Sequence, residues 1–169
     1  VSDFCIGAVG AVDTVCIYSQ RPIESLKEIY LDFHSRTSVA LAQLLIKEYW
    51  QLQPKFLSSS EGYIDKITGT TGGVVIGDRT IGLDKRFEYV YDLGEVWQQH
   101  TGLPFVFAAW VSTRPLPTNF IRQFNEALQL GVEQIPTLMY LLPSPQPDFD
   151  LEAYFTKYIS YHLDDDKKK

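Results

Sequence analysis

The sequence has few of the residues that build disulfide frameworks and metal centres. Among 169 residues there are two cysteines and three histidines, and neither type recurs at a ligand spacing such as Cys-x-x-Cys or His-x-x-x-His. Cys5 and Cys16 lie within alternating apolar runs, which is typical of small, reduced side chains buried in strands. We therefore expect no disulfide and no bound metal.

Long apolar runs and an excess of basic residues are missing as well. No stretch of 18 uninterrupted apolar residues occurs, and the N-terminal residues lack the basic leader and cleavage pattern of a signal peptide. The 21 acidic residues outnumber the 15 basic ones, and the resulting net charge of -6 argues against a nucleic-acid surface. We expect a soluble, cytoplasmic protein that contacts neither membrane nor nucleic acid, although one local pocket can still hold an anion.

Several catalytic signatures are absent from the chain. It has no Walker loop, no Gly-x-Gly-x-x-Gly after a strand and no Gly-x-Ser-x-Gly elbow, which argues against nucleotide-phosphate and serine-hydrolase chemistry. Residues 70 to 73, with the sequence TTGG, could cradle a phosphate. A plain flexible turn before a strand is the commoner structure of such a stretch.

The residues that are present favour a layered α/β protein. Hydrophobic residues make up 45% of the chain and aromatic residues 14%, which is enough for a substantial core. Strand-like and helix-like periodicities alternate along the chain. We expect strands within 4–19, 28–33, 72–78 and 103–112, and helices over 37–53, 91–102, 118–139 and 150–169.

Two long strands, 11–19 and 103–113, bracket a smaller βα insert, which suggests two lobes joined by a pair of crossing strands. Residues 1–19 then hold the remainder of a first lobe and one crossing strand. Residues 20–102 form a second, inserted lobe, and residues 103–169 hold the returning strand and the C-terminal helices of the first. The chain starts inside a strand and stops within a charged run, so we expect it to be a fragment.

Polar residues crowd the start of the helix predicted from residue 37. Ser35, Arg36, Thr37 and Ser38 stand in succession, where one serine or threonine would suffice to cap the helix. A helix N-terminus also offers free N–H groups and a positive dipole, so hydroxyls and a guanidinium beside it make a carboxylate or phosphate site. Asp78, directly after a buried strand, and Asp92, at the start of a predicted helix, are the acidic residues best placed for a cleft. We expect Asp92 to cap its helix, with Glu95 three residues later, whereas site and structural roles are equally compatible with Asp78.

Three runs in this order carry a family resemblance: YLDFHSRTSVALAQLL, GGVVIGDRTIG and YDLGEVWQQHTGLPFVFAAWV. They resemble the chorismate dehydratase family of the futalosine route to menaquinone, over nearly the whole chain. The resemblance implies a type II periplasmic-binding-protein-like fold with two α/β lobes and substrate closed between them. Family members are longer and begin with an N-terminal segment that is rich in site residues and absent here.

The implied reaction removes water from chorismate to give 3-[(1-carboxyvinyl)oxy]benzoate, without a cofactor. On this interpretation Ser35, Arg36, Thr37 and Ser38 bind a substrate carboxylate, while Thr101, Gly102 and Phe105 line the side of the crossing strands. Asp78 transfers a proton or orients a donor, unless a carboxylate of the substrate is itself the base. The alternatives are a solute-binding protein of the same fold and the related 1,4-dihydroxy-6-naphthoate synthase.

Overall fold

The computed structural model describes residues 1–147 and 149–169, and within them the strands form two sheets. The strands are β1 (Phe4–Ala8), β2 (Val15–Ser19), β3 (Glu28–Leu31), β4 (Lys55–Ser58), β5 (Thr71–Ile76), β6 (Tyr89–Asp92), β7 (Phe105–Ala109) and β8 (Ser160–His162). The helices are α1 (Arg36–Glu48), α2 (Leu93–Thr101), α3 (Thr118–Glu133), α4 (Ile135–Leu138) and the short α5 (Leu151–Ala153), which continues as a π-helical turn over Tyr154–Tyr158.

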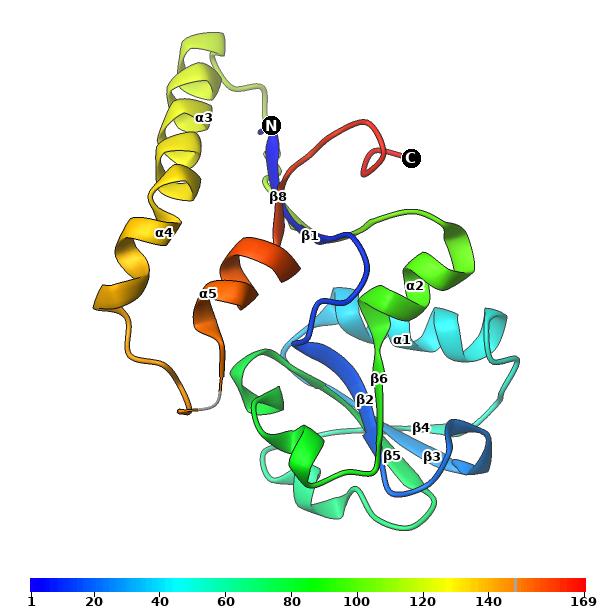
Figure 1. Ribbon diagram of the computed structural model, residues 1–169. Coiled ribbons are helices and arrows are strands. Elements are labelled where there is room, and N and C mark those ends of the chain that lie inside the picture. The colour runs from blue at the N-terminus through cyan, green and yellow to red at the C-terminus, as the bar shows by residue number, and fades with distance from the viewer. Residues whose placement is uncertain (148) are drawn as a thin grey trace.

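The larger sheet has the strand order β4-β3-β5-β2-β6, and α1 and α2 pack together beside it in the lower part of Figure 1. In this sheet β3 runs parallel to β4 and β5, whereas β2 is antiparallel to β5 and β6. The smaller sheet has the order β7-β1-β8, with both neighbours antiparallel to β1. The described residues thus form a mixed α/β structure, as the alternating periodicities predict.

The main core lies between the larger sheet and α1. Leu41, Ala42, Leu45 and Ile46 recur at helical spacing on one face of α1, and all four are buried. They pack into one cluster with sheet residues such as Ile17, Ile29 and Val74. Each leucine, isoleucine or valine side chain contributes about 1.5 to 3 kcal/mol on burial, so this contact holds α1 against the sheet.

Helix α1 ends at Glu48, five residues earlier than the predicted end at residue 53. The chain leaves the helix where Gln51 adopts a left-handed conformation with φ 55°, and the amide of Leu52 donates to the carbonyl of Ile46 (2.9 Å). Left-handed residues commonly end helices because they turn the chain away from the helix axis. The proline at position 54 therefore follows the helix end and does not cause it.

The predicted helix over 150–169 is wrong for most of its length. The helical turns end at Tyr158, and β8 follows as the third strand of the smaller sheet, with Gly7 opposite Ser160 and Phe4 opposite His162. Ile159, Tyr161 and Leu163 alternate with polar residues, a period of two that fits a strand. The charged run after β8 forms turns, not a helix face.

The two glycines considered for a phosphate cradle lie inside β5. A Cβ atom on Gly73 would come within 2.5 Å of Ile67 Cδ1, and one on Gly72 within 2.7 Å of Leu26 Cδ1. Both backbones also pair with β3, so their amides belong to the sheet. The structure uses this stretch for close packing of side chains over the sheet, and the phosphate interpretation is wrong.

Both cysteines are free and buried, in β1 and β2, which confirms the expected burial of small side chains in strands. Burial raises the pKa of the Cys16 thiol, and the nearby Asp92 carboxylate raises it further. Burial likewise raises the pKa of Cys5, against an opposing effect of Lys167. Thiols in such surroundings react slowly because the thiolate is the nucleophile.

At pH 8 a disulfide reagent labels both thiols when the protein is unfolded in guanidinium chloride. We expect neither thiol of the folded protein to react within the time that this labelling takes. The Cys5→Ser variant reports on Cys16 alone, which has the larger shift of pKa. One equivalent of rapid labelling of the folded variant would contradict the buried position of Cys16.

No helix in the described part of the chain has the length and apolar character needed to cross a membrane.

Candidate functional site

The N-terminus of α1 combines a side-chain cap with free amides. Ser35 has extended backbone angles, and its Oγ accepts the N–H of Ser38 (3.1 Å) and donates to Ser38 Oγ (3.0 Å). The first amides of a helix have no partner within the helix, so those of Arg36 and Thr37 stay available. Ser35 is therefore the cap, and it leaves two N–H groups for another acceptor.

A hollow of about 380 Å³ opens beside this helix end. Of the four predicted binding residues, Ser35 and Arg36 line it; Thr37 is exposed next to them, and Ser38 is buried beneath the cap. The remaining lining residues come from the ends of β3 and β4, from the loop before α1 and from the first turn of α1: Leu31, Asp32, Phe33, His34, Val39, Ser58 and Ser59. A guanidinium, hydroxyls and a helix dipole here suit a carboxylate or phosphate group.

A buried carboxylate fixes the loop that leads into α1. Asp32, whose side chain is fully buried, accepts the backbone N–H of His34 (2.8 Å) through Oδ1. Its Oδ2 accepts from the Tyr63 hydroxyl (2.8 Å) and from Arg79 Nη2 (2.6 Å). Burial raises the pKa of Tyr63, and the bond to Asp32 raises it further, so the phenol stays a neutral donor. Tyr63 and Arg79 hold the Asp32 carboxylate in place, and the carboxylate in turn holds the His34 amide, directly before the cap residue Ser35.

A second hollow of about 570 Å³ lies on the other side of Phe33 and His34. Arg79 lines it, with its guanidinium carbon 5.4 Å from the centre of the Phe33 ring, a cation–π arrangement. The rings of Phe33 and His34 are 4.0 Å apart and contribute to the walls of both hollows. Arginine side chains therefore flank the Phe33–His34 pair on both sides.

Asp78 lies on the turn Gly77–Thr80 that follows β5, and its side chain is exposed. The next residue, Arg79, reaches the buried Asp32, whereas Asp78 points to solvent-accessible space. The structure therefore does not bring Asp78 into the lining of either hollow beside Phe33.

Thr101 and Gly102 lie at the C-terminal end of α2, which is near the C-terminal end of α1, whereas Ser35 lies at the N-terminal end of α1. Next to them His100 packs its ring 5.6 Å from that of Tyr49, which follows the last turn of α1. A helix of 13 residues is about 20 Å long, so this position is remote from the start of α1. The structure does not bring these residues together with Ser35.

The groups near Thr101 have local structural partners. The Thr101 hydroxyl donates to the Trp97 carbonyl (2.8 Å) and accepts the N–H of Leu103 (3.1 Å), and Gly102 ends α2 with φ 71°. Phe105 packs edge-on against Trp97, with ring centres 5.2 Å apart. These contacts fasten the end of α2 to the start of β7.

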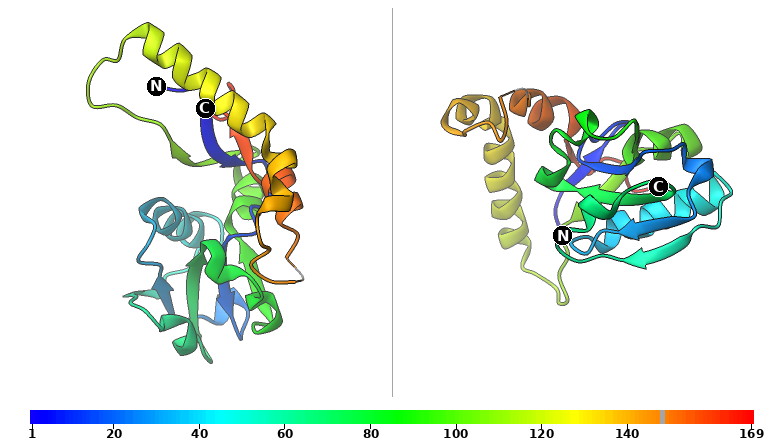
Figure 2. Two further views of the ribbon diagram at one scale, coloured as in Figure 1. Left: turned by 90° about the vertical axis from the view of Figure 1, so that its left-hand side faces the viewer. Right: turned by 90° about the horizontal axis from the view of Figure 1, so that it is seen from below.

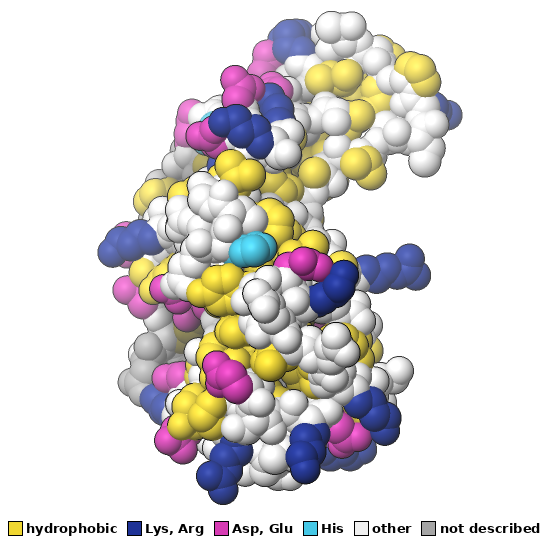
Figure 3. Space-filling model, turned by 90° about the vertical axis from the view of Figure 1, so that its right-hand side faces the viewer, with side chains coloured by type: hydrophobic (Ala, Val, Ile, Leu, Met, Phe, Trp, Pro, Cys, Tyr) yellow, Lys and Arg dark blue, Asp and Glu magenta, His cyan; other side chains and the backbone are white. Residues whose placement is uncertain are grey.

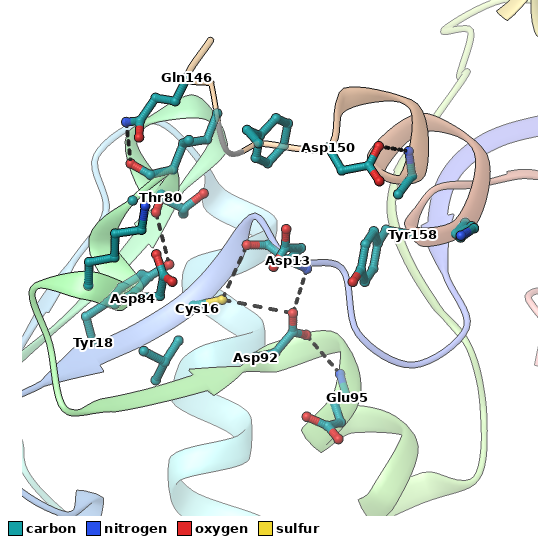
Figure 4. A pocket seen from close by; sticks show the side chains of 17 residues that line it. Asp13, Cys16, Tyr18, Thr80, Asp84, Asp92, Glu95, Gln146, Asp150 and Tyr158 are labelled. Atoms are coloured by element: carbon teal, nitrogen blue, oxygen red, sulfur yellow. Dashed lines mark hydrogen bonds between the residues drawn. The ribbon is translucent and has the colours of Figure 1, made fainter. Parts of the chain in front are cut away.

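A third hollow of about 570 Å³ is acidic, with the carboxylates of Asp13, Asp84, Asp92, Glu95 and Asp150 in its lining (Figure 4). Asp92 is the predicted N-cap of α2, and its carboxylate accepts the N–H groups of Gly94 (2.9 Å) and Glu95 (3.0 Å). It also accepts those of Val12 (3.0 Å) and Asp13 (2.6 Å). Burial raises the pKa of Asp92, and these four bonds oppose that effect.

The negative charge of this third hollow disfavours an anionic ligand. Among the described residues, no group of three or more His, Cys, Asp or Glu side chains is arranged to hold a metal ion. Asp92 instead ties the β1–β2 connection to the start of α2. The α1 N-terminus is therefore the hollow whose charge best suits an anion.

Analysis of the sequence alone missed Asp32, Tyr63 and Arg79. Two signals were present: an aspartate that directly follows the apolar strand EIYL, and an arginine adjacent to the nominated Asp78. An ionisable group at the end of a buried strand needs a partner, since an unpaired buried charge is costly. The identity of that partner, 47 residues away, was not encoded in any local pattern.

The described residues define a mixed α/β protein with a hollow at a helix N-terminus, lined by Ser35 and Arg36 among others. The sequence model of the family described as menaquinone biosynthesis matches residues 1–169. The chain belongs to this family.

Comparisons with two individual proteins add to this family match. It is 32% identical over 152 residues to the chorismate dehydratase of Thermus thermophilus, a match that covers 79% of this chain and 55% of that protein. The chain therefore spans about half the length of this curated relative, and the resemblance found in the sequence motifs is confirmed. The crystal structure of a protein from Archaeoglobus fulgidus is similar in fold, with a TM-score of 0.59 and 14% identity; the match covers 99% of this chain and 66% of that one.

Proposed function

We propose that the protein acts as a chorismate dehydratase, which converts chorismate into 3-[(1-carboxyvinyl)oxy]benzoate. The observation that carries this proposal is the 32% identity to a chorismate dehydratase, within a family match over the whole chain. The chain spans 55% of that relative, so the activity that belongs to the complete enzyme is proposed for a protein of full family length.

For the fold we propose the two-lobed, type II periplasmic-binding-protein-like arrangement. Apart from β2 (Val15–Ser19), which comes from the segment before the insert, the larger sheet and its helices belong to the inserted lobe, residues 20–102. The smaller sheet with α3 to α5 belongs to the first lobe. Two chain segments that join the sheets support this division: one leads from β1 to β2, the other from α2 to β7. The α1 N-terminus lies in the inserted lobe, where a second lobe can close over it.

In the site, we assign a carboxylate of chorismate to the N-terminus of α1. The amides of Arg36 and Thr37 donate to its oxygens, and the Arg36 guanidinium supplies a charge-assisted bond. The hollow beside Ser35 has space for such a group. Phe33 offers an apolar wall, nearly half exposed, against which an unsaturated ring can pack.

The elimination requires a base and a leaving hydroxyl. When a base removes the C3 proton, the electrons of that C–H bond form the new C3–C4 double bond, and the C4–O bond breaks with its electron pair. The departing hydroxide takes up a proton, which the protonated base can return, and leaves as water. The ring becomes aromatic, which makes the reaction favourable without any transfer of electrons to a cofactor. What the protein supplies is orientation of the dianion and of the departing groups.

Two candidates for the base are Asp78 and a carboxylate of the substrate itself. The Asp78→Asn variant separates them, because it keeps the size of the side chain and removes its basicity. A loss of turnover by about 100-fold or more assigns the proton transfer to Asp78, within the usual effect of such a group. Unchanged turnover excludes Asp78 and leaves the substrate carboxylate as the other of these two candidates.

The proposed function is tested by incubating the purified protein of full family length with chorismate and following the product by absorbance and chromatography. We expect time-dependent formation of the aromatic enol ether. Saturable binding of chorismate without product would contradict the enzyme and favour a solute-binding protein of the same fold.

A further inference from the structure

The hollow beside Ser35 lies in the lower body of the molecule, where α1 packs on the larger sheet, apart from the arm of α3 and α4 (Figure 2). The polar part of its described lining consists of serine hydroxyls, the charged side chains of Asp32 and Arg36, and the imidazole of His34. Arginine keeps its proton and a serine hydroxyl stays neutral, whereas an imidazole both donates and accepts protons readily. The chemistry of His34 therefore suits proton transfer in this hollow.

The side chain of His34 is 55% exposed, yet the contacts around it hold it in place. Its backbone N–H donates to Asp32 Oδ1 (2.8 Å), and Nδ1 of its ring lies 3.9 Å from the same oxygen. This second distance is too long for a hydrogen bond, but it places a buried carboxylate next to the ring. The ring also packs against that of Phe33, with 4.0 Å between the centres. Because Nδ1 faces Asp32, Nε2 is the ring nitrogen left for a molecule in the hollow.

Charged groups lie on both sides of His34, which lines two hollows. They are Asp32 and Arg36 in the hollow beside Ser35, and Glu61, Asp65, Arg79 and Arg86 in the hollow beyond Phe33. Arg79 pairs with Asp32 and Arg86 with Asp65, so these four charges are engaged with one another. On the face shown in Figure 3, acidic and basic side chains are likewise interspersed over the lower body. The cation that meets an anion beside His34 is therefore Arg36.

Loss of water from chorismate requires a proton for the departing oxygen, because hydroxide is strongly basic and leaves poorly. The C4 hydroxyl of chorismate and its enol-ether side chain, which ends in a carboxylate, are carried by adjacent ring carbons. A side chain next to the amides that bind this carboxylate therefore lies close to the C4 oxygen. His34 directly precedes the cap residue Ser35, and the available amides of Arg36 and Thr37 follow it.

We propose that His34 is the general acid of the elimination, an inference that rests on the proposed function. The C4–O bond breaks with its electron pair, and the oxygen takes the proton from His34 Nε2 and leaves as water. The electrons of the C3–H bond form the new double bond, and the base, Asp78 or a substrate carboxylate, keeps the C3 proton. Afterwards the base releases this proton to water and the imidazole takes one up, so the cycle balances. Asp32 is a positioning residue that acts through the Nδ1 side of the ring.

The first measurement is of kcat and KM for chorismate in the His34→Ala variant of the protein of full family length. We expect kcat to fall by about 100-fold or more, the usual effect of a general acid, with KM little changed. His100→Ala is the matched control. His100 is also exposed and packs against an aromatic ring, that of Tyr49 at 5.6 Å, but it is remote from the hollow, so both constants should stay unchanged.

Added imidazole provides a readout that a purely structural role of His34 would not move. Free imidazole can enter the space vacated in His34→Ala, and we expect it to restore part of the turnover. The recovered rate, relative to the wild type in the same buffers, should follow the concentration of the protonated imidazolium ion. Recovery that follows neutral imidazole would identify His34 as a base, and no recovery would exclude a proton transfer by its ring; either result overturns the assignment.

The positioning role of Asp32 is tested with Asp32→Asn, alone and combined with His34→Ala. Asp32→Asn alone should lower kcat, whereas the double variant should lose no more turnover than His34→Ala, because Asp32 acts through the ring that is already absent. A further loss of kcat in the double variant would contradict this role. Circular dichroism verifies folding, and if Asp32→Asn unfolds, the His34→Ala kinetics and the imidazole experiment decide the assignment of the general acid.

The wild-type protein separates this inference from the proposed function. If the wild type forms the aromatic product and His34→Ala forms it with the same kcat, His34 is not the acid, and the chorismate dehydratase activity stands. If the wild type binds chorismate and forms no product, the proposed function fails and the role of His34 fails with it.

Discussion

Replacing Arg79 by leucine is expected to lower the free energy of unfolding by about 3–5 kcal/mol, the usual cost of removing one partner from a buried ion pair. The substitution removes the guanidinium that lies 2.6 Å from the fully buried Asp32 carboxylate. The Tyr63 hydroxyl and the His34 N–H remain as donors, but neither carries a charge that compensates the carboxylate. Urea unfolding followed by fluorescence measures the change.

Arg86→Leu is the matched control. Arg86 pairs with Asp65 at 2.8 Å and stacks over Phe87 at 5.2 Å, much as Arg79 does with Asp32 and Phe33. The Asp65 side chain is 78% exposed, so the loss of this pair should cost at most about 1 kcal/mol. Equal effects of the two substitutions would show that the Asp32 pair contributes no more than a surface pair.

A double-mutant cycle isolates the interaction itself. Asp32→Asn combined with Arg79→Leu removes both charges at once, so the second substitution no longer leaves an unpaired buried carboxylate. We expect the double variant to be more stable than the sum of the single effects predicts, by about 1–3 kcal/mol. Additive effects would contradict direct coupling between Asp32 and Arg79.

Replacing Arg36 by alanine is expected to weaken binding of chorismate by about 1.5–3 kcal/mol, or roughly 10- to 150-fold in the dissociation constant. Arg36 is exposed at the hollow and, unlike Arg79, has no carboxylate partner among the ion pairs recorded for the described residues. Its charge is therefore available to an incoming anion. Titration calorimetry with the protein of full family length measures the change.

Lys47→Ala provides the control for charge. Lys47 lies in the last turn of the same helix, and its side chain is 77% exposed beside Glu48. Removing it changes the net charge of the protein as Arg36→Ala does, but at the far end of α1. A similar loss of affinity in both variants would mean that the anion responds to the overall charge and not to the helix N-terminus.

Ser35 and Ser38 have different roles at this helix end. Ser35→Ala removes the cap and should cost about 1 kcal/mol of stability. Ser38 is buried and bonded to Ser35, so its hydroxyl is directed into the protein. The cluster before the helix is thus both a cap, through Ser35 and Ser38, and a candidate anion site, through Arg36 and Thr37.

The sequence predicted well those features that depend on neighbouring residues. The helical spacing of Leu41, Leu45 and Ile46 places the apolar face of α1, and Asp92 caps α2 as expected. The prediction failed after Tyr158, where a short strand stands in place of a helix. Three residues of alternating polarity are a weak signal, and their pairing with β1, more than 150 residues away, decides their structure.

By itself, the sequence determined the α/β class, the start of α1 to within one residue, the buried thiols and the family. These depend on periodicity, capping and motifs, all of which act over a few residues. Only the tertiary structure decided that Arg79 reaches Asp32 and that Thr101 lies far from Ser35. The physical reason is that such contacts depend on which strands become neighbours in a sheet. β3 and β5 lie side by side, and the ends of these strands carry Asp32 and Arg79 to one place.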